Sequence, residues 1–330
     1  MSVSDLQLTY TTLRQAVGVF LGYGRTVVNW STAQENRIND IVECGTRQVY
    51  WPSSGHEWSF LKPSDTIYVW GDIAVGTATV TGVYAAPTTT LTASEASFYE
   101  SMVDKSIVIT GTGTYTIAGY TSTTVVTITA DATCAAKTFS IASNGNFRLP
   151  DDFGGLSGNL TFVTEQAGRC PIRVVGPSLI ERKRQQDTSS SGTPRLAAFR
   201  PKPAEASGAQ YWELMIWPEP DGEYEMNYTY NIRPDKLGAT QLYHYGGVEL
   251  SECLRQSCLA VAEQDADDVA GVHTQLFDKL LAAAIENDLR TKQPKVLGYN
   301  ADHSVNLNSR RGLRNQHYDC INVTVDGILY

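Results

Sequence analysis

The sequence has few basic residues and few histidines for its length. It contains 26 Lys and Arg against 35 Asp and Glu, a formal net charge of -9, and five His among 330 residues. Proteins that hold nucleic acids place clustered Lys and Arg against the phosphates, so this shortage argues against a protein whose main task is to grip DNA or RNA. The negative charge is still compatible with DNA that passes close to the protein, because an acidic wall repels a duplex instead of holding it.

Long apolar runs and a targeting pattern are also missing. No stretch reaches the roughly 18 consecutive apolar residues of a transmembrane helix. The opening segment MSVSDLQLTY lacks the basic and apolar regions of a signal peptide. We therefore expect a chain that is assembled in a cytoplasm.

Motifs for metal binding and for common enzyme chemistry are missing as well. The six cysteines are scattered without a C-x-x-C pair, so we interpret them as buried thiols and not as zinc ligands. The chain has no G-x-x-x-x-G-K-S/T loop, no H-E-x-x-H helix and no G-x-S-x-G turn. We expect no enzymatic activity, no catalytic residue, no cofactor and no metal.

One short stretch, NFRLPDDFGG at residues 146–155, does contain a tripeptide that binds magnesium in protein kinases, Asp152-Phe153-Gly154. A kinase also needs a histidine-arginine-aspartate loop upstream and, before that, a β-strand lysine. The preceding segment TCAAKTFSIASNGNFRLP contains neither. We interpret the stretch as a structural turn, in which the aspartates bond to the backbone and the glycines adopt unusual dihedrals.

Apolar residues at helical spacing predict two helices in the first 50 residues. A capping box of Ser4 and Gln7 opens the first, and Gly22 follows its end. A second box, Thr32 with Glu35, opens the next helix, which ends at the tripeptide YWP. The two helices are predicted to form an α-hairpin.

The composition changes sharply between about residues 72 and 144. The segment is rich in Thr, Val, Ile, Gly and Tyr, and short alternating runs are bounded by Gly, Ser and Asn. This pattern predicts a small antiparallel sandwich or barrel. Lys105 and Lys137 are its only basic residues, which makes it a poor candidate for binding nucleic acid.

The pattern after residue 155 predicts mixed β structure. The runs NLTFVT, CPIRVVG, YWELMIWP and YEMNYTYNIRP are typical of strands, and the last two lie across a turn at Glu219-Pro220-Asp221-Gly222. Between CPIRVVG and YWELMIWP, the segment ERKRQQDTSSSGTP is polar and is predicted to be a surface loop.

Two amphipathic helices and a tail complete the chain. Leu250, Leu254, Cys258 and Val261 mark one apolar stripe, a second runs from 269 to 285, and AEQDADD joins or kinks the two helices. From Lys295 the periodicity is lost. The final segment CINVTVDGILY alternates like a strand that has no local partner, a pattern that suits pairing with another subunit or folding back on its own domain.

Five motifs follow one another outside the β-rich segment, and their order carries the resemblance described next: HEWSFLKP, LPDDFGGLSGNLTF, ELMIWPEPDGEYEMNYTYNIRP, YGGVELSECLRQSCLAVAE and LGYNAD. In this order they resemble the head-to-tail adaptor, or connector, proteins of tailed bacteriophages, particularly the adaptor of short-tailed phages. The resemblance implies a structural protein of the virion, located at the head-tail interface. It implies a ring of twelve copies beneath the portal protein, which continues the DNA channel without specific DNA binding and offers a docking surface to tail nozzle, tube or fibre proteins.

We therefore expect an α+β fold: a helical bundle of the N-terminal hairpin and C-terminal helices, with mixed β elements, an inserted small antiparallel β-domain and an extended C-terminal arm. The predicted boundaries are 1–71 for the N-terminal helical part of the core, 72–145 for the inserted domain, 146–294 for the rest of the core and 295–330 for the arm. The inserted domain is expected to contact tail or fibre proteins.

Two sets of residues are predicted to make the main contacts of such an adaptor. The predicted ring interface is Leu250, Leu254, Val261, Leu276, Phe277, Leu280 and Ile285. The resemblance implies that a C-terminal extension, here Asn306 to Tyr330, grips the portal, and its candidate residues are Ile321, Val323, Val325, Ile328 and Tyr330.

Two alternatives stay open. One is a carbohydrate-binding or depolymerising tail protein, with Tyr211, Trp212 and Trp217 as sugar-stacking residues, although their alternation favours a place in the core. The other is a tail terminator or tube protein, which would form a six-fold ring.

Overall fold

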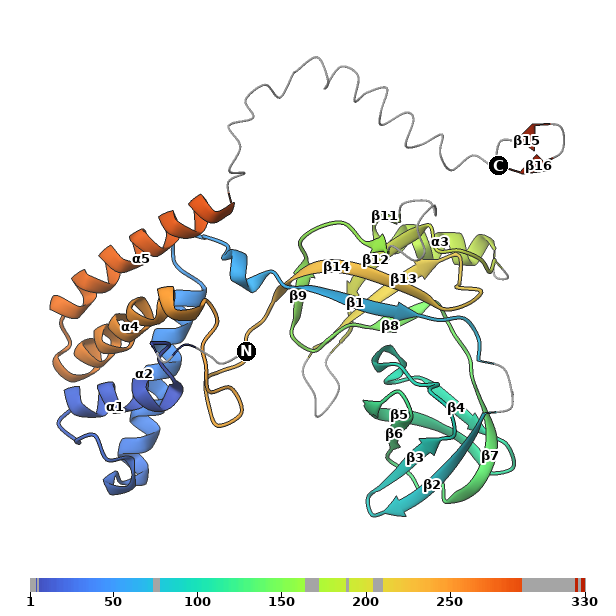
Figure 1. The fold of residues 1–330 in the computed structure, drawn as a ribbon, viewed down its shortest axis with the longest axis horizontal. Helices are drawn as coiled ribbons and strands as arrows, with labels where there is room; N and C mark the ends of the chain where they lie inside the picture. The colour runs from blue at the N-terminus through green and yellow to red at the C-terminus, as the bar shows by residue number, and fades with distance from the viewer. Residues whose placement is uncertain are drawn as a thin grey trace. The chain divides into compact units, whose positions relative to one another are not determined.

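A computed structural model describes residues 4, 6–73, 78–163, 172–187, 190–203 and 210–292, and the backbone of 324–325 and 328–329. The chain divides into two compact units (Figure 1). The helical unit comprises Met1–Pro63 and Ile232–Asp302, and the β unit comprises Ser64–Asn231 and His303–Tyr330. The helical unit is thus built from two segments that the β unit separates in the sequence.

In the described residues of the helical unit there are four α-helices, and their apolar stripes meet in one core. They are α1 (Tyr10–Phe20), α2 (Thr32–Tyr50), α4 (Gly247–Asp267) and α5 (Val272–Lys292), with 3-10 turns η1 (Val27–Asn29) and η2 (Ser59–Leu61) between them. The core contains fully buried side chains from three of these helices, among them Val17, Ile38 and Leu254. The predicted helices are therefore confirmed.

The starts of α1 and α2 lie at other residues than predicted. Thr9 caps α1 in a box with Thr12, and Ser31 caps α2 in a box with Gln34. In each case the cap hydroxyl accepts a hydrogen bond from the backbone N–H three residues later. The predicted boxes were wrong because Ser and Thr lie close together at both starts, and the composition does not single out the cap.

The segment AEQDADD belongs to α4 and does not join or kink the two helices. α4 runs through it to Asp267, and the C-cap residue Asp268 adopts a left-handed conformation with φ 53°. The carboxylate of Glu263 on α4 then accepts hydrogen bonds from the backbone N–H groups of Gly271, Val272 and His273. A side chain of one helix thereby caps the N-terminus of the next.

Helices α2 and α4 are in close contact at Gly45. A Cβ atom built on Gly45 would lie 2.8 Å from the Cα of Cys258, closer than two such atoms can approach. Beside this contact the Ser257 hydroxyl donates a 2.9 Å hydrogen bond to the Gly45 carbonyl. Glycine therefore sets the distance between the two helices.

Six antiparallel strands of the β unit close into a barrel in the order β2-β3-β6-β5-β4-β7. They are β2 (Thr79–Ala85), β3 (Thr88–Ala93), β4 (Ser106–Ile109), β5 (Gly113–Ser122), β6 (Val125–Ile128) and β7 (Cys134–Ile141), and η3 (Glu100–Met102) lies between β3 and β4. Alternate residues such as Leu91, Ile107 and Ile128 are fully buried inside it. Closure removes the exposed strand edges that an open sheet would leave.

The described part of the β unit also contains two four-stranded sheets. The first has the order β1-β14-β10 with β9 also paired to β14, and the second has the order β11-β12-β13-β8. Their strands are β1 (Ser64–Val69), β8 (Asn146–Arg148), β9 (Phe153–Leu156), β10 (Thr161–Phe162), β11 (Arg173–Val174), β12 (Leu196–Pro201), β13 (Trp212–Trp217) and β14 (Tyr224–Ile232). The strands β13 and β14, which lie across the predicted turn, belong to different sheets and do not pair with each other.

The polar segment predicted to be a loop is partly helical. Helix α3 (Pro177–Gln186) has Pro at its start and buries Ile180 against the second sheet. Arg184 donates hydrogen bonds to the side chain of Asn146 and to the carbonyls of Gly145 and Ile216. The loop prediction was wrong because the charged residues obscured this one-sided helix.

The tripeptide that resembles a kinase motif builds the core of the β unit. Phe153 is fully buried and stacks on Phe199 of the second sheet and on Tyr230 of the first, with ring centroids 5.6 and 5.5 Å apart. The Phe153 N–H donates to the Pro150 carbonyl, which forms the predicted turn. Asp152 accepts a hydrogen bond from the Tyr230 hydroxyl. The stretch thus joins the two sheets.

The predicted fold class is wrong. The structure is rich in β strands, with a closed barrel and several sheets beside five helices, and is not a helical bundle that carries a small inserted β-domain. The strands outside the barrel belong with it to the β unit, which also contains helix α3. Near the C-terminus, β15 (Thr324–Val325) and β16 (Ile328–Leu329) pair as a short antiparallel ladder.

Substitution Gly45→Ala tests the contact between α2 and α4. Alanine normally stabilises a helix relative to glycine by roughly 0.5–1 kcal/mol, but the added methyl group would overlap the backbone of α4. We expect a net loss of about 1–3 kcal/mol in the free energy of unfolding by urea. Cys44→Ala, at an exposed neighbouring position, is the control and should change it little. Equal stability of both variants would contradict the contact.

Candidate functional site

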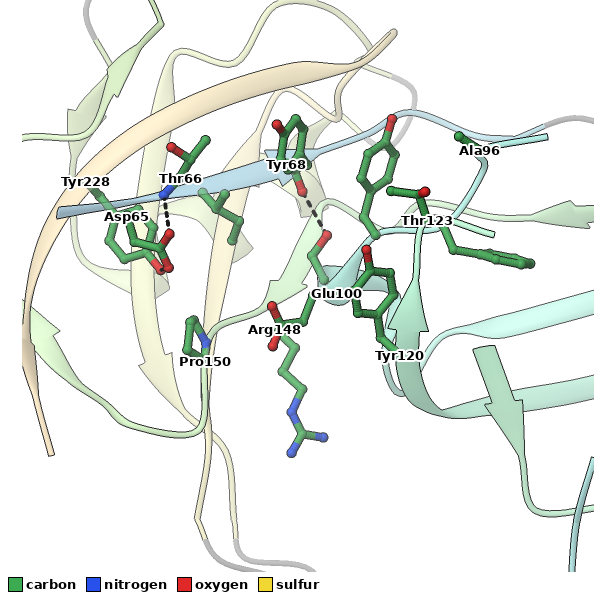
Figure 2. Close-up of a pocket in the computed structure, with 14 residues that line it drawn as sticks. Asp65, Thr66, Tyr68, Ala96, Glu100, Tyr120, Thr123, Arg148, Pro150 and Tyr228 are labelled. Atoms are coloured by element: carbon green, nitrogen blue, oxygen red, sulfur yellow. Dashed lines mark hydrogen bonds between the residues drawn. The ribbon is translucent and has the colours of Figure 1, made fainter. Parts of the chain in front are cut away.

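A cavity of about 340 Å³ lies in the β unit and is lined mainly by tyrosine rings and carboxylates. We call it the tyrosine pocket. Its residues come from β1, β5, β8, β14, the segment around η3 and the residues that follow β5 and β8: Asp65, Thr66, Ile67, Tyr68, Ala96, Phe98, Tyr99, Glu100, Ser101, Tyr120, Thr123, Arg148, Pro150 and Tyr228. Figure 2 shows Glu100 between Tyr68 and Arg148, with Tyr120 beside it.

Strand alternation places a tyrosine at the mouth of the pocket. In β1 the side chains of Ile67 and Val69 point into the core, and Tyr68 between them is 42% exposed. Tyr68 stacks on Tyr99 with ring centroids 5.1 Å apart and an angle of 14° between the planes. The Ser101 hydroxyl donates a 2.8 Å hydrogen bond to the Tyr68 carbonyl and holds η3 against β1.

Carboxylates make the pocket acidic. Desolvation raises the pKa of Glu100, and the carboxylates of Asp65, Asp151 and Asp152 raise it further, while the charge of Arg148 acts in the opposite direction. Desolvation is also the main cause of the raised pKa values of Tyr68 and Tyr99. The phenols therefore stay protonated at neutral pH.

Arg148 is held at the edge of the pocket by several partners. Its guanidinium donates to the carboxylates of Asp104 and Asp151, the second at 3.0 Å. It also lies over the ring of Tyr211, 4.4 Å from the centroid. The cation is thus fixed and partly neutralised before any ligand enters.

The pocket offers groups that can bind a small ligand. Its rings supply flat apolar surface, and its carboxylates and hydroxyls supply hydrogen bonds. In the described part of the chain, no three His, Cys, Asp or Glu side chains gather as metal ligands. No sequence pattern predicted this site, because its residues come from distant segments of the chain and are ordinary in type.

The residues of the predicted ring interface mostly lie inside the helical unit. Leu250, Leu254 and Phe277 are buried in its core, and Val261, Leu280 and Ile285 are partly buried against it. Leu276 is 40% exposed. A ring contact by these residues stays a prediction, and Leu276 is the member of the set that a neighbouring subunit can reach most directly.

The predicted portal-binding arm falls largely outside the described residues. Ile321, Val323 and Tyr330 lie outside them, and only the backbone of Val325 and Ile328 is described, in β15 and β16. Portal contact by the arm stays a prediction.

The residues of the carbohydrate alternative do not form an open platform. Trp212 packs edge-on against Phe153, and Lys183 lies over the ring of Trp217. Tyr211 carries Arg148 on its ring. All three aromatic side chains are partly buried and already in contact with protein groups.

The cysteines are more varied than expected. Cys253 and Cys258 are buried, and desolvation raises the pKa of each thiol to about 12. Cys134 is half-buried and Cys44 is exposed, so the prediction of buried thiols was wrong for Cys44. Cys170 lies outside the described residues, as does Cys320.

No protein-family model matches the chain, and no curated protein matches it in sequence. Among the described residues, none of the helices combines the length and the hydropathy that crossing a membrane requires.

The raised pKa of Glu100 predicts a pH-dependent effect of Glu100→Gln. The folded state holds this proton more tightly than the unfolded state, so the stabilisation present at low pH is lost as the pH rises through the folded-state pKa. The variant lacks the charge, and we expect it to melt at a higher temperature than the wild type at pH 7.

This difference should vanish near pH 4, where the wild-type carboxyl is largely protonated too. Glu95→Gln is the control, because Glu95 is an exposed carboxylate of the β unit that does not line the pocket. Thermal denaturation at both pH values measures the effect. A lower melting temperature of Glu100→Gln at pH 7 would contradict the proposed acidity of the pocket.

Proposed function

We propose that this chain is a structural adaptor of a tailed bacteriophage, which forms a ring beneath the portal and joins the capsid to the tail. The proposal places it in the virion, with the portal protein above it and tail nozzle, tube or fibre proteins as its other partners. Genomic DNA passes through the ring without specific binding. The order of the five sequence motifs suggested this function, and the surface of the helical unit supports it.

The observation that carries the proposal is the distribution of exposed apolar side chains. Sixteen large apolar side chains are exposed in the described part of the chain, of which eleven lie in the helical unit, the shorter of the two, and five in the β unit. The eleven are Leu6, Val19, Val28, Trp51, Leu242, Tyr243, Val248, Val269, Val272, Leu276 and Leu289. Apolar surface concentrated in this way is typical of a protein that packs against copies of itself.

The charge of the chain agrees with a passage for DNA. With a formal net charge of -9, the chain repels phosphate overall, as the wall of a channel must if DNA is to slide along it. In this proposal the helices make the ring contacts, Asn306 to Tyr330 reaches the portal, and the barrel contacts tail or fibre proteins.

A matched pair of valines tests the ring contact. Val272 on α5 is 66% exposed and Val83 on β2 of the barrel is 64% exposed. We expect Val272→Asp to lower the fraction of ring assembled with the portal protein by about tenfold or more, because an interface would bury the new charge without a partner. Val83→Asp should leave the ring fraction unchanged.

Mass photometry measures both fractions, and the proposed ring has a mass near twelve times 36.1 kDa. Leu276→Glu provides a second interface variant on the same helix. If Val272→Asp and Leu276→Glu assemble as well as the wild type and the control Val83→Asp, the helical unit does not make the ring contacts. Rings of six copies would instead support the tail terminator or tube alternative.

A further inference from the structure

We propose that the tyrosine pocket binds a neutral saccharide of one or two sugar rings. This site does not depend on the proposed ring, and it uses other residues than the aromatic side chains of β13. The cavity of about 340 Å³ falls at the lower end of the range of small-molecule sites. It therefore suits a compact ligand better than a folded partner or a long chain.

The rings of the pocket suit the flat apolar face of a sugar. Tyr68 and Tyr99 are stacked on each other, so the pair is already ordered and loses little conformational freedom when a ligand packs on it. The ring of Tyr120 lies close to both of them, near Glu100 (Figure 2). Tyr68 is 42% exposed and is the ring that a ligand meets first.

The polar groups suit hydroxyls, which donate and accept hydrogen bonds at once. The carboxylates of Asp65 and Glu100 accept, and the hydroxyls of Tyr120 and Thr123 do both. Glu100 has no hydrogen-bond or ion-pair partner in the part of the chain that the structure describes. A sugar hydroxyl can donate to this carboxylate and restore a hydrogen bond to it.

The charges of the pocket favour an uncharged ligand. The carboxylates that raise the pKa of Glu100 would repel a phosphate, a sialic acid or a uronic acid. A cationic ligand would meet the residual charge of Arg148, which Asp104 and Asp151 hold at the same pocket and partly neutralise. A neutral sugar avoids both repulsions, and its hydroxyls can form hydrogen bonds with the carboxylates and hydroxyls of the pocket.

The test is an array of neutral oligosaccharides, with sialylated glycans and an arginine-rich peptide as charged competitors, probed with the full-length chain. Hits are then titrated by calorimetry as free mono- and disaccharides. We expect binding of at least one neutral sugar, and weaker binding of its sialylated form.

Two tyrosines with equal exposure provide the matched variants. Tyr68 in the pocket and Tyr84 on β2 outside it are both 42% exposed, so neither substitution empties the core. We expect Tyr68→Ala to weaken sugar binding about tenfold or more and Tyr84→Ala to leave it unchanged. Thermal denaturation checks that both variants fold.

Three outcomes would overturn the proposal. The first is that no neutral sugar binds to the folded wild-type chain. The second is that Tyr68→Ala binds the sugar as tightly as Tyr84→Ala does. The third is that the arginine-rich peptide binds in preference to every sugar and loses its affinity in Tyr68→Ala, which would make the pocket a docking site for a basic protein.

Discussion

The packing of α2 against α4 is the contact on which the helical unit depends. Gly45 and Cys258 belong to segments that residues Ser64–Asn231 of the β unit separate in the sequence, and their backbones meet because Gly45 has no side chain. The Ser257 hydroxyl bonds to the Gly45 carbonyl at the same point. The helical core therefore forms only when the segments before and after the β strands come together. The β unit has a core of its own.

The β unit builds its own core through the packing of Phe153 and through closure of its barrel. Phe153 stacks on rings from both sheets, while the barrel pairs all its strands internally. Each unit is thus stabilised by its own buried side chains, and its surface is available for contacts. Most of the large apolar side chains that are exposed in the described residues belong to the helical unit, whereas the tyrosine pocket lies in the β unit. The proposed assembly and the proposed ligand thus use different units.

Local patterns predicted the elements better than they predicted their arrangement. The apolar spacing located α1, α2, α4 and α5, and the alternation between residues 72 and 144 indicated a sandwich or barrel. The partners of strands were not predictable, because β14 pairs with β1, whose residues lie about 160 positions away, and not with its neighbour β13. Helix α3 was missed because Ile180 is its only buried residue, and the pocket was missed because Tyr68, Glu100 and Arg148 converge only in the folded chain.

The subunit count of the complex tests the proposed adaptor most directly. Electron microscopy of the full-length chain, with and without the portal protein of the same virus, shows how many copies assemble and where. The account predicts a closed ring of twelve copies on the portal, with the helical units in contact around it. A ring of six copies, or a chain that stays monomeric in the presence of the portal, would contradict it.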